Sequence, residues 1–165
     1  DKLGIDKPVL VGHSDGGSIA LIHAGGAGRA VAGLILMAPH VFVEDLSIAS
    51  IAQAKVTFQT TDLAQKLGRY HRDPATTFRG WNDIWLHPDF RAWNIEEVLP
   101  HVTCPVSVIQ GEDDEYGTPA QVEAIRRQAK GEVEVLMLAD CRHSPHKDQP
   151  QATLEAMAGF IERIS

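Results

Sequence analysis

The sequence predicts an α/β fold, with a mostly parallel sheet and helices on both faces of that sheet. Two observations carry this prediction: short apolar runs alternate with stretches of helix-compatible pattern, and glycines or prolines stand at the ends of several runs. Strands that alternate with helices are typical of parallel sheets, because each connection must cross back along the sheet. Four runs are predicted to be strands: Pro8 to Val11, Ala32 to Met37, Pro105 to Gln110 and Val133 to Leu138.

The first run opens a strand, a tight turn and a helix. It is short and apolar, it ends at Gly12, and small and apolar residues continue in a helical pattern from Ser18 to Ala24. The second run has Gly33 near its start and Pro39 after its end, and it is long enough for a strand that is covered on both faces. A crossover between two parallel strands follows from this order.

The last third of the chain repeats the alternation. A helical stretch near Gln121 to Lys130 separates the third and fourth runs, and a final helix is expected over Gln151 to Ile164. We therefore assign residues 1–41 and 101–165 to the core of the fold.

Residues 42–100, between the second and third strands, form a region of different character. Helix formers and aromatics dominate it, with breaks at Gly68, Pro74 and Pro88, so we expect a helical insertion, or cap, rather than an independent domain. Four of its apolar residues recur at helical spacing and are predicted to form a core stripe: Phe78, Trp81, Ile84 and Trp85.

Composition narrows the class of protein. The 165 residues are 44% hydrophobic and 22% charged, as in one globular domain, and the net charge of -7 includes no basic block that could follow a nucleic-acid backbone. No apolar stretch approaches the roughly 20 residues that cross a bilayer. Cys104 and Cys141 lack the spacing of a zinc site and are expected to be buried free thiols. We expect a soluble, cytoplasmic protein with neither nucleic acid nor membrane as a partner.

The segment Gly12-His13-Ser14-Asp15-Gly16 fits the G-x-S-x-G nucleophile elbow, and it lies between a predicted strand and a predicted helix as that motif requires. Two glycines are expected to remove collisions around a serine in a strained turn. At the helix N-terminus, the backbone N–H of Asp15 becomes a candidate oxyanion donor. The alternative for the five residues alone is an ordinary glycine-rich turn with an N-capping serine.

With these elements in this order, the chain resembles the C-terminal half of the α/β-hydrolase superfamily. The resemblance places an acid in a G-x-x-D pattern after the next-to-last strand, where Gly111-Glu112-Asp113-Asp114 stands, so Asp114 matches. Asp113 is the rival for this role, and a solvated acidic turn is the alternative for both. An aspartate there would hold the tautomer of a histidine and stabilise its imidazolium.

The resemblance places that histidine after the last strand. His143 matches, with His146 as a second candidate on the following helix start, and Arg142 stands where the superfamily usually has glycine. A metal site at this histidine pair is disfavoured because no third ligand stands beside them. His13 is expected to pack or to tune the pocket. The remaining histidines are expected at the surface or in satisfied core positions: His23, His40, His71, His87 and His101.

The order Ser14, Asp114, His143 is the one that the α/β-hydrolase fold imposes. It implies a cofactor-free and metal-free hydrolase of an ester, thioester or carbon–carbon bond in a small acyl substrate, working through an acyl-enzyme. A serine at the elbow argues against the dehalogenase and epoxide hydrolase branches, which carry aspartate there. Perhydrolysis through the same serine and a non-catalytic interaction domain with a remnant triad are the alternatives.

Longer members of the superfamily have further strands before the elbow, and one of their loops supplies a second oxyanion donor. The chain starts at Asp1 and reaches a strand within a few residues, so it reads as a piece of something longer. We expect it to associate through Pro8 to Val11, either as a homo-oligomer or with a missing N-terminal half. The 165-residue chain by itself is expected to be a weak catalyst, because removing one oxyanion donor typically costs about 10² to 10³ in rate.

Overall fold

The computed structural model describes residues 4–165, and the chain divides into two compact units. The first unit comprises the described residues up to Phe42 together with Asn94–Ser165, and the second comprises Val43–Trp93. Phe42 and residues 94–100, which the sequence analysis assigned to the insertion, therefore lie in the first unit.

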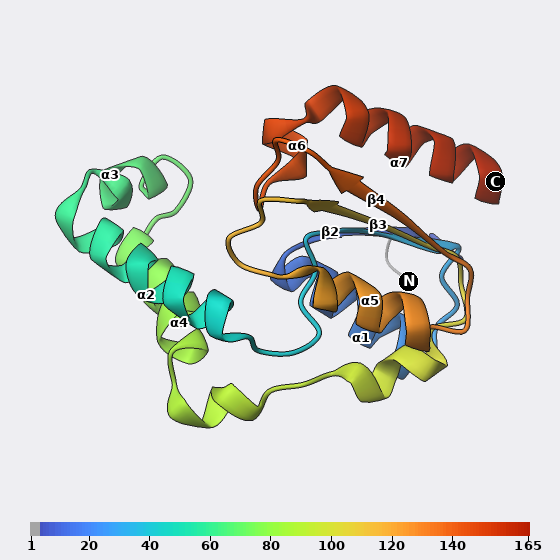
Figure 1. Cartoon of the computed structure of the whole chain (residues 1–165), viewed down its shortest axis with the longest axis horizontal. Coiled ribbons are helices and arrows are strands. Elements are labelled where there is room, and N and C mark those ends of the chain that lie inside the picture. Colours follow the sequence, from blue (N-terminus) through green and yellow to red (C-terminus); the bar gives the residue numbers. More distant parts are fainter. Residues whose placement is uncertain (1–3) are drawn as a thin grey trace. The chain divides into compact units, whose positions relative to one another are not determined.

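The first unit is built on a four-stranded parallel sheet in the order β1-β2-β3-β4 (Figure 1). The α/β fold class predicted from the sequence is confirmed, and the strand ends differ from the predicted ones by at most one or two residues. The strands are β1 (Val9–His13), β2 (Gly33–Met37), β3 (Val106–Gly111) and β4 (Val133–Leu138).

Helices cover both faces of this sheet. Figure 1 shows α1 (Asp15–Gly26) and α5 (Pro119–Gln128) on one face and α7 (Pro150–Ile164) on the other. The short helix α6 (Pro145–Asp148) precedes α7, and the 3₁₀ helix η2 (Glu96–His101) packs against α1 and α5. The packing of η2 explains why residues 94–100 belong to the sheet unit.

Two strands are buried along their whole length, as the continuous apolar runs predicted. Every residue of β2 and β3 is buried, because helices lie on both faces there. On the face that α7 covers, the buried cluster combines strand residues with Phe160 of α7 and Cys141 from the loop after β4. Partly buried residues of α7 pack against this cluster: Ala152, Ala156, Met157 and Ile164. The strand residues of this cluster are Ile35, Met37, Ile109 and Leu138.

Helix starts follow the local chemistry of the sequence. Thr118 precedes Pro119, and its hydroxyl accepts the N–H of Ala120 at 3.2 Å at the start of α5. Proline in the first turn suits both α5 and α7, because that position has no intrahelical donor to lose.

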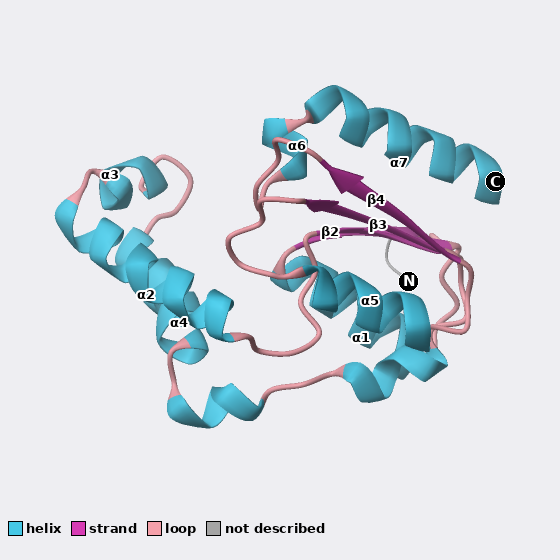
Figure 2. Ribbon diagram, in the orientation of Figure 1, coloured by secondary structure: helices cyan, strands magenta, loops and turns pink. Residues whose placement is uncertain are grey.

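The second unit is helical in every regular element, as Figure 2 shows. Its elements are α2 (Asp45–Thr60), α3 (Leu63–Leu67), α4 (Pro74–Trp85) and the 3₁₀ helix η1 (Pro88–Ala92). Gly68 caps the end of α3, and Asp73 caps α4 by accepting the N–H of Thr76 at 2.9 Å. The breaks expected in the sequence therefore mark element boundaries.

The expected core stripe of this unit is only partly present, because Trp81 is half-buried and Ile84 is exposed. Phe78 and Trp85 are buried, and Phe78 stacks on Phe58 at a centroid distance of 4.0 Å. Ile84, however, is 53% exposed, so its prediction as a core residue is wrong. Asn82 is buried on α4 instead, where its amide donates to the carbonyl of Ile51 at 2.9 Å.

Two further expectations concern membranes and thiols. Among the described residues, no helix is long and apolar enough to span a membrane.

Both cysteines are free; Cys141 is buried as expected, whereas Cys104 is only partly buried. Burial raises the pKa of both thiols above the usual value.

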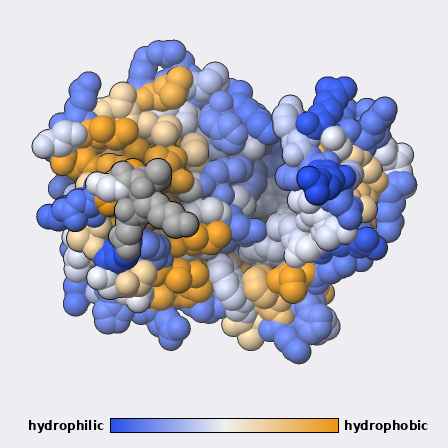
Figure 3. Space-filling view, turned by 180° about the vertical axis from the view of Figure 1, so that it is seen from behind, coloured by the Kyte–Doolittle hydropathy of each residue, from blue (hydrophilic) through white to orange (hydrophobic). Residues whose placement is uncertain are grey.

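One edge of the sheet is open within the described residues, because β1 pairs there with β2 alone. Val11 pairs in register with Ile35, and the two side chains share a face of the sheet. Ile35 is fully buried and Val11 is 51% exposed, so the helical cover of this face ends between β2 and β1. Hydrophobic side chains, drawn in orange, gather on the face of this unit that Figure 3 displays.

We propose that a second copy of the chain pairs along this edge, because unpaired backbone groups beside exposed apolar side chains favour strand addition. Light scattering is expected to give at least twice the monomer mass for the wild type. Val11→Lys should reduce this association, whereas Val56→Lys, at a helix valine that is 48% exposed, should leave it unchanged. A wild type that stays monomeric at high concentration would contradict this proposal.

Candidate active site

The carboxyl ends of the parallel strands lie at one edge of the sheet, where α/β folds commonly hold their ligands. Ser14 directly follows β1, Asp114 follows β3 by three residues, and His143 follows β4 in the loop before α6. Although up to 129 sequence positions separate them, their side chains form one hydrogen-bonded chain.

Ser14 lies in a strained turn between β1 and α1. Its φ of 54° is in the region that residues other than glycine rarely adopt, a conformation that costs on the order of 1–3 kcal/mol. Its N–H donates to the carbonyl of Met37 at 2.9 Å, and its carbonyl accepts the N–H of Gly17 at 2.8 Å. These bonds hold the serine at the helix N-terminus, where Asp15 begins α1.

The two glycines of the elbow have different structural roles. A Cβ at Gly12 would lie 2.3 Å from the carbonyl oxygen of Gly16, so only glycine fits at the first position. A Cβ at Gly16 itself would meet nothing within 4 Å, and the expected collision there is wrong. The second close approach is at Gly17, where a Cβ would lie 2.9 Å from the Cβ of Pro39.

Asp114 is the carboxylate that reaches the histidine. Its side chain is 2% exposed, and its Oδ1 accepts from Nδ1 of His143 at 2.8 Å. The same oxygen accepts the N–H groups of Tyr116 at 2.8 Å and Gly117 at 3.3 Å, which fix the carboxylate. Asp113 is exposed, and its backbone N–H donates to the carbonyl of Cys141 at 3.0 Å.

The ring of His143 lies between the serine and the aspartate. Its Nε2 is 2.9 Å from Oγ of Ser14, and its Nδ1 is 2.8 Å from Oδ1 of Asp114. Because an ionised carboxylate only accepts, Nδ1 carries the proton and Nε2 is available to accept one from the hydroxyl. This arrangement can activate a serine as a nucleophile.

Three more aromatic rings surround that of His143. His13 lies at a centroid distance of 5.1 Å, His40 at 5.6 Å and Tyr116 at 4.7 Å. The ring of His146 packs edge-on against that of His13 at 5.0 Å, whereas the hydrogen bond to Ser14 comes from His143. Sequence reasoning missed Tyr116 and the place of His40, which is 3% exposed. The only signal for His40 was its position just after a predicted strand end.

Burial shifts the pKa of two of these groups. The pKa of His13 is lowered, mainly because burial disfavours its charged form, with the charges of His143, His146 and Lys147 acting in the same direction. Its hydrogen bond to the backbone of His143 opposes this shift. The pKa of Tyr116 is raised, first by burial and then by the neighbouring Glu115.

Within residues 4–165, no group of three or more histidine, cysteine, aspartate or glutamate side chains is arranged to hold a metal ion.

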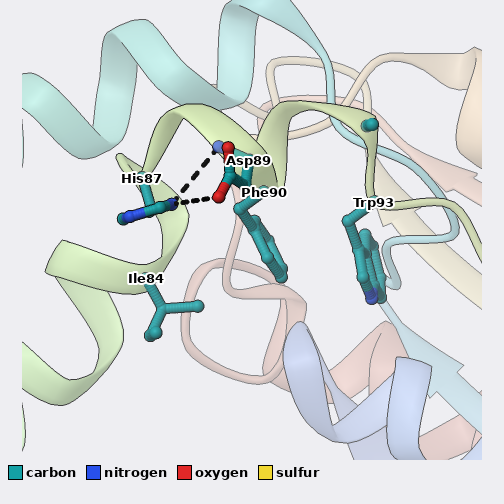
Figure 4. A pocket seen from close by; sticks show the side chains of 6 residues that line it. Ile84, His87, Asp89, Phe90 and Trp93 are labelled. Carbon is teal, nitrogen blue, oxygen red and sulfur yellow. Dashed lines mark hydrogen bonds and ion pairs between the residues drawn. The ribbon is translucent and has the colours of Figure 1, made fainter.

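The second unit has a cavity of about 360 Å³ of its own (Figure 4). In it, Phe90 stacks on Trp93 at 5.4 Å, and Nδ1 of His87 accepts the N–H of Asp89 at 3.2 Å. The lining residues are Ile84, His87, Asp89, Phe90, Ala92 and Trp93.

Comparison with protein families gives a match to the model described as the alpha/beta hydrolase family, over residues 1–156. The chain belongs to this family. Comparison with curated proteins gives no match.

Solved alpha/beta hydrolase-like structures superpose on nearly the whole chain. VinJ is 23% identical with a TM-score of 0.69 and covers 99% of this chain. A serine hydrolase involved in carbazole degradation, CarC, is 19% identical with a TM-score of 0.71 and covers 96%. A thermophilic esterase from Thermogutta terrifontis is 20% identical with a TM-score of 0.64 and covers 96%.

The chain spans 69% of the length of VinJ, 65% of CarC and 66% of the Thermogutta terrifontis esterase. At these identities the likeness shows the alpha/beta hydrolase fold alone.

Arg142 stands directly before His143, where the superfamily usually has glycine, and the backbone of this turn accepts it. Among the described residues, Arg142 is not one of the non-glycine residues with positive φ; that conformation falls instead on Asp140, with a φ of 51°. The left-handed residue of the turn after β4 therefore lies two positions before Arg142. Gly111 allows the loop to pass closely, since a Cβ there would lie 2.1 Å from the carbonyl oxygen of Cys141.

A matched pair of substitutions tests the steric account of the elbow. Gly12→Ala forces a methyl group into the backbone of α1 and should lower the free energy of unfolding by about 3 kcal/mol or more. Gly16→Ala places its methyl group in open space within a helix and should change stability by less than about 1 kcal/mol, in the stabilising direction. Urea denaturation measures both, and equal losses would contradict the account.

Proposed function

We propose that this chain is the catalytic part of a serine hydrolase that cleaves an ester-like bond, an ester, a thioester or an activated carbon–carbon bond, in a small acyl substrate. The observation that carries the proposal is the unbroken hydrogen-bonded chain from Oγ of Ser14 through His143 to Asp114, at 2.9 Å and 2.8 Å. The family adds support, as do two proteins of similar structure, an esterase and a serine hydrolase.

The proposed reaction starts at Ser14. Its Oγ attacks the acyl carbon while Nε2 of His143 takes the hydroxyl proton, and the leaving group departs with that proton. Asp114 holds the ring in the tautomer that can accept and stabilises the imidazolium while it exists. Water, activated by the same ring, then hydrolyses the acyl-enzyme and regenerates the serine.

The start of α1 supplies positive potential where the reaction develops negative charge. Ser14 precedes the first residue of this 12-residue helix, so the N-terminal partial charge of the helix lies at the attacked carbonyl. The backbone N–H of Asp15 is the proposed oxyanion donor. One such donor typically contributes about 3 to 4 kcal/mol of transition-state stabilisation.

Labelling with a fluorophosphonate separates this enzyme from a non-catalytic interaction domain that retains a remnant triad. Wild-type chain should be labelled at one serine, and Ser14→Ala should abolish labelling while thermal unfolding stays unchanged, since alanine fits the same turn. Ser165→Ala, at an exposed serine, is the matched control and should be labelled like the wild type. A wild type that resists labelling while folded would favour the interaction domain.

Asparagine substitutions test the choice of acid. Asp114→Asn should reduce p-nitrophenyl acetate turnover by on the order of 10⁴, because an amide favours the wrong tautomer of His143. Asp113→Asn, on the exposed neighbour, should stay near the wild-type rate. The reverse order of losses would move the acid to Asp113.

A further inference from the structure

We propose that His13 and Glu115 are positioning residues that hold the main chain of His143 in place between Ser14 and Asp114. The inference rests on the proposed function, and it assigns roles to two side chains that need not touch the substrate. It concerns the backbone of the histidine, whereas Ser14 and Asp114 hold the ring.

Both backbone polar groups of His143 are bonded to side chains. Its N–H donates to Oε2 of Glu115 at 3.1 Å, and its carbonyl oxygen lies 2.7 Å from Nε2 of His13. Because a carbonyl oxygen only accepts, Nε2 of His13 carries the proton in this bond. The loop that carries His143, residues 139–144, is called the histidine loop. It has no helix or strand, so these two bonds replace the support that a regular element would give it.

The two positioning residues are chain neighbours of the two residues that bind the ring. His13 directly precedes Ser14, and Glu115 directly follows Asp114. The end of β1 and the turn that follows it therefore bind both the carbonyl group and Nε2 of His143, and the loop after β3 binds both Nδ1 and the N–H group. A shift of the histidine loop would break bonds to the ring and to the backbone together, which restricts the ring to its bridging position.

Arg142 keeps Glu115 in the orientation that this role requires. Its guanidinium Nη2 lies 2.9 Å from Oε1 of Glu115, while the other carboxylate oxygen, Oε2, accepts the N–H of His143. The backbone N–H of Arg142 donates to Asp148 at 2.9 Å, which ties the same loop to α6. Because the Arg142 side chain is 67% exposed, the ion pair contributes little stability directly. The effect of the ion pair is to fix the orientation of the Glu115 carboxylate toward the N–H of His143.

A neutral His13 suits this position. The ring centroids of His13 and His143 are 5.1 Å apart, and a cation at that distance would oppose the imidazolium that forms on His143 during catalysis. Burial lowers the pKa of His13, which favours the neutral ring, and the bond to the carbonyl of His143 places the proton of that ring on Nε2.

Amide hydrogen exchange at His143, followed by NMR, tests the contacts without relying on activity. Glu115→Ala removes the acceptor and should raise the exchange rate of this amide at least tenfold, while core amides of β3 keep their rates. Glu112→Ala, at an exposed glutamate of the same loop, is the matched control and should leave the rate unchanged. An unchanged rate in Glu115→Ala would overturn the role of Glu115.

Kinetics tests the role of His13. His13→Leu should lower kcat for p-nitrophenyl acetate by about 10- to 100-fold with KM nearly unchanged, since a misplaced ring impairs proton transfer rather than binding. His13→Gln should restore most of the loss, because its amide nitrogen is the same number of bonds from Cβ and donates a similar hydrogen bond. His101→Leu, at an exposed histidine, controls for loss of an imidazole.

Equal kcat losses in His13→Leu and His13→Gln, or losses matched by a fall in thermal stability, would overturn the positioning role of His13. If wild-type chain neither turns over nor labels, the proposed function fails. The positioning role of His13 is then decided by a second NMR measurement, the exchange rate of the His143 amide in the His13 variants, because loss of the bond to the His143 carbonyl loosens the loop that holds this amide. His13→Leu should raise that rate and His13→Gln should not.

Discussion

The structure depends on the parallel pairing of its four strands, because this pairing brings every strand's carboxyl end to one edge of the sheet. Residues that are far apart in sequence are thereby placed within hydrogen-bonding distance: Ser14, Asp114 and His143 each follow a different strand. The buried strands β2 and β3 stabilise this arrangement, since helices on both faces exclude water from their apolar side chains.

Backbone strain in the described residues is concentrated at the same edge. The non-glycine residues with positive φ are Ser14, Ala38 and Asp140, each one or two residues after a strand. The sheet supplies the compensating bonds: the N–H of Ser14 donates to the carbonyl of Met37, and the N–H of Ala38 donates to that of Ile109, both at 2.9 Å. The backbone also approaches closely at Gly12 and Gly111. A side chain at Gly12 would collide with the start of α1, and one at Gly111 would collide with the loop that carries His143.

The histidine loop is the part of the site with least regular structure, and it is also the part with most side-chain support. Glu115 and His13 bond to its main chain, Asp114 and Ser14 bond to its ring, and Arg142 pairs with Glu115. An imidazole that must move a proton between oxygens needs its orientation fixed to a few tenths of an ångström. Bonds from the end of β1, from the turn after it and from the loop after β3 supply this more effectively than packing alone.

The sequence by itself determined the fold class, the order of the strands and a short set of candidate site residues: Ser14, His143 and an acid at Asp114 or Asp113. These follow from local signals, such as apolar runs, glycines in the elbow and the residues after predicted strand ends, together with a resemblance that depends on motif order. Tertiary structure decided what depends on contacts between distant segments. In the structure, Asp114 and not Asp113 forms the hydrogen bond to His143. Glycine is sterically required at position 12 and not at position 16. Tertiary contacts also bring His40, Tyr116 and Glu115 to the site, and no sequence spacing predicts the place of these three residues. Ile84 is exposed in the structure, although helical periodicity predicted that it would be buried. The physical reason is that periodicity describes one element's face, whereas contact depends on which other element covers it.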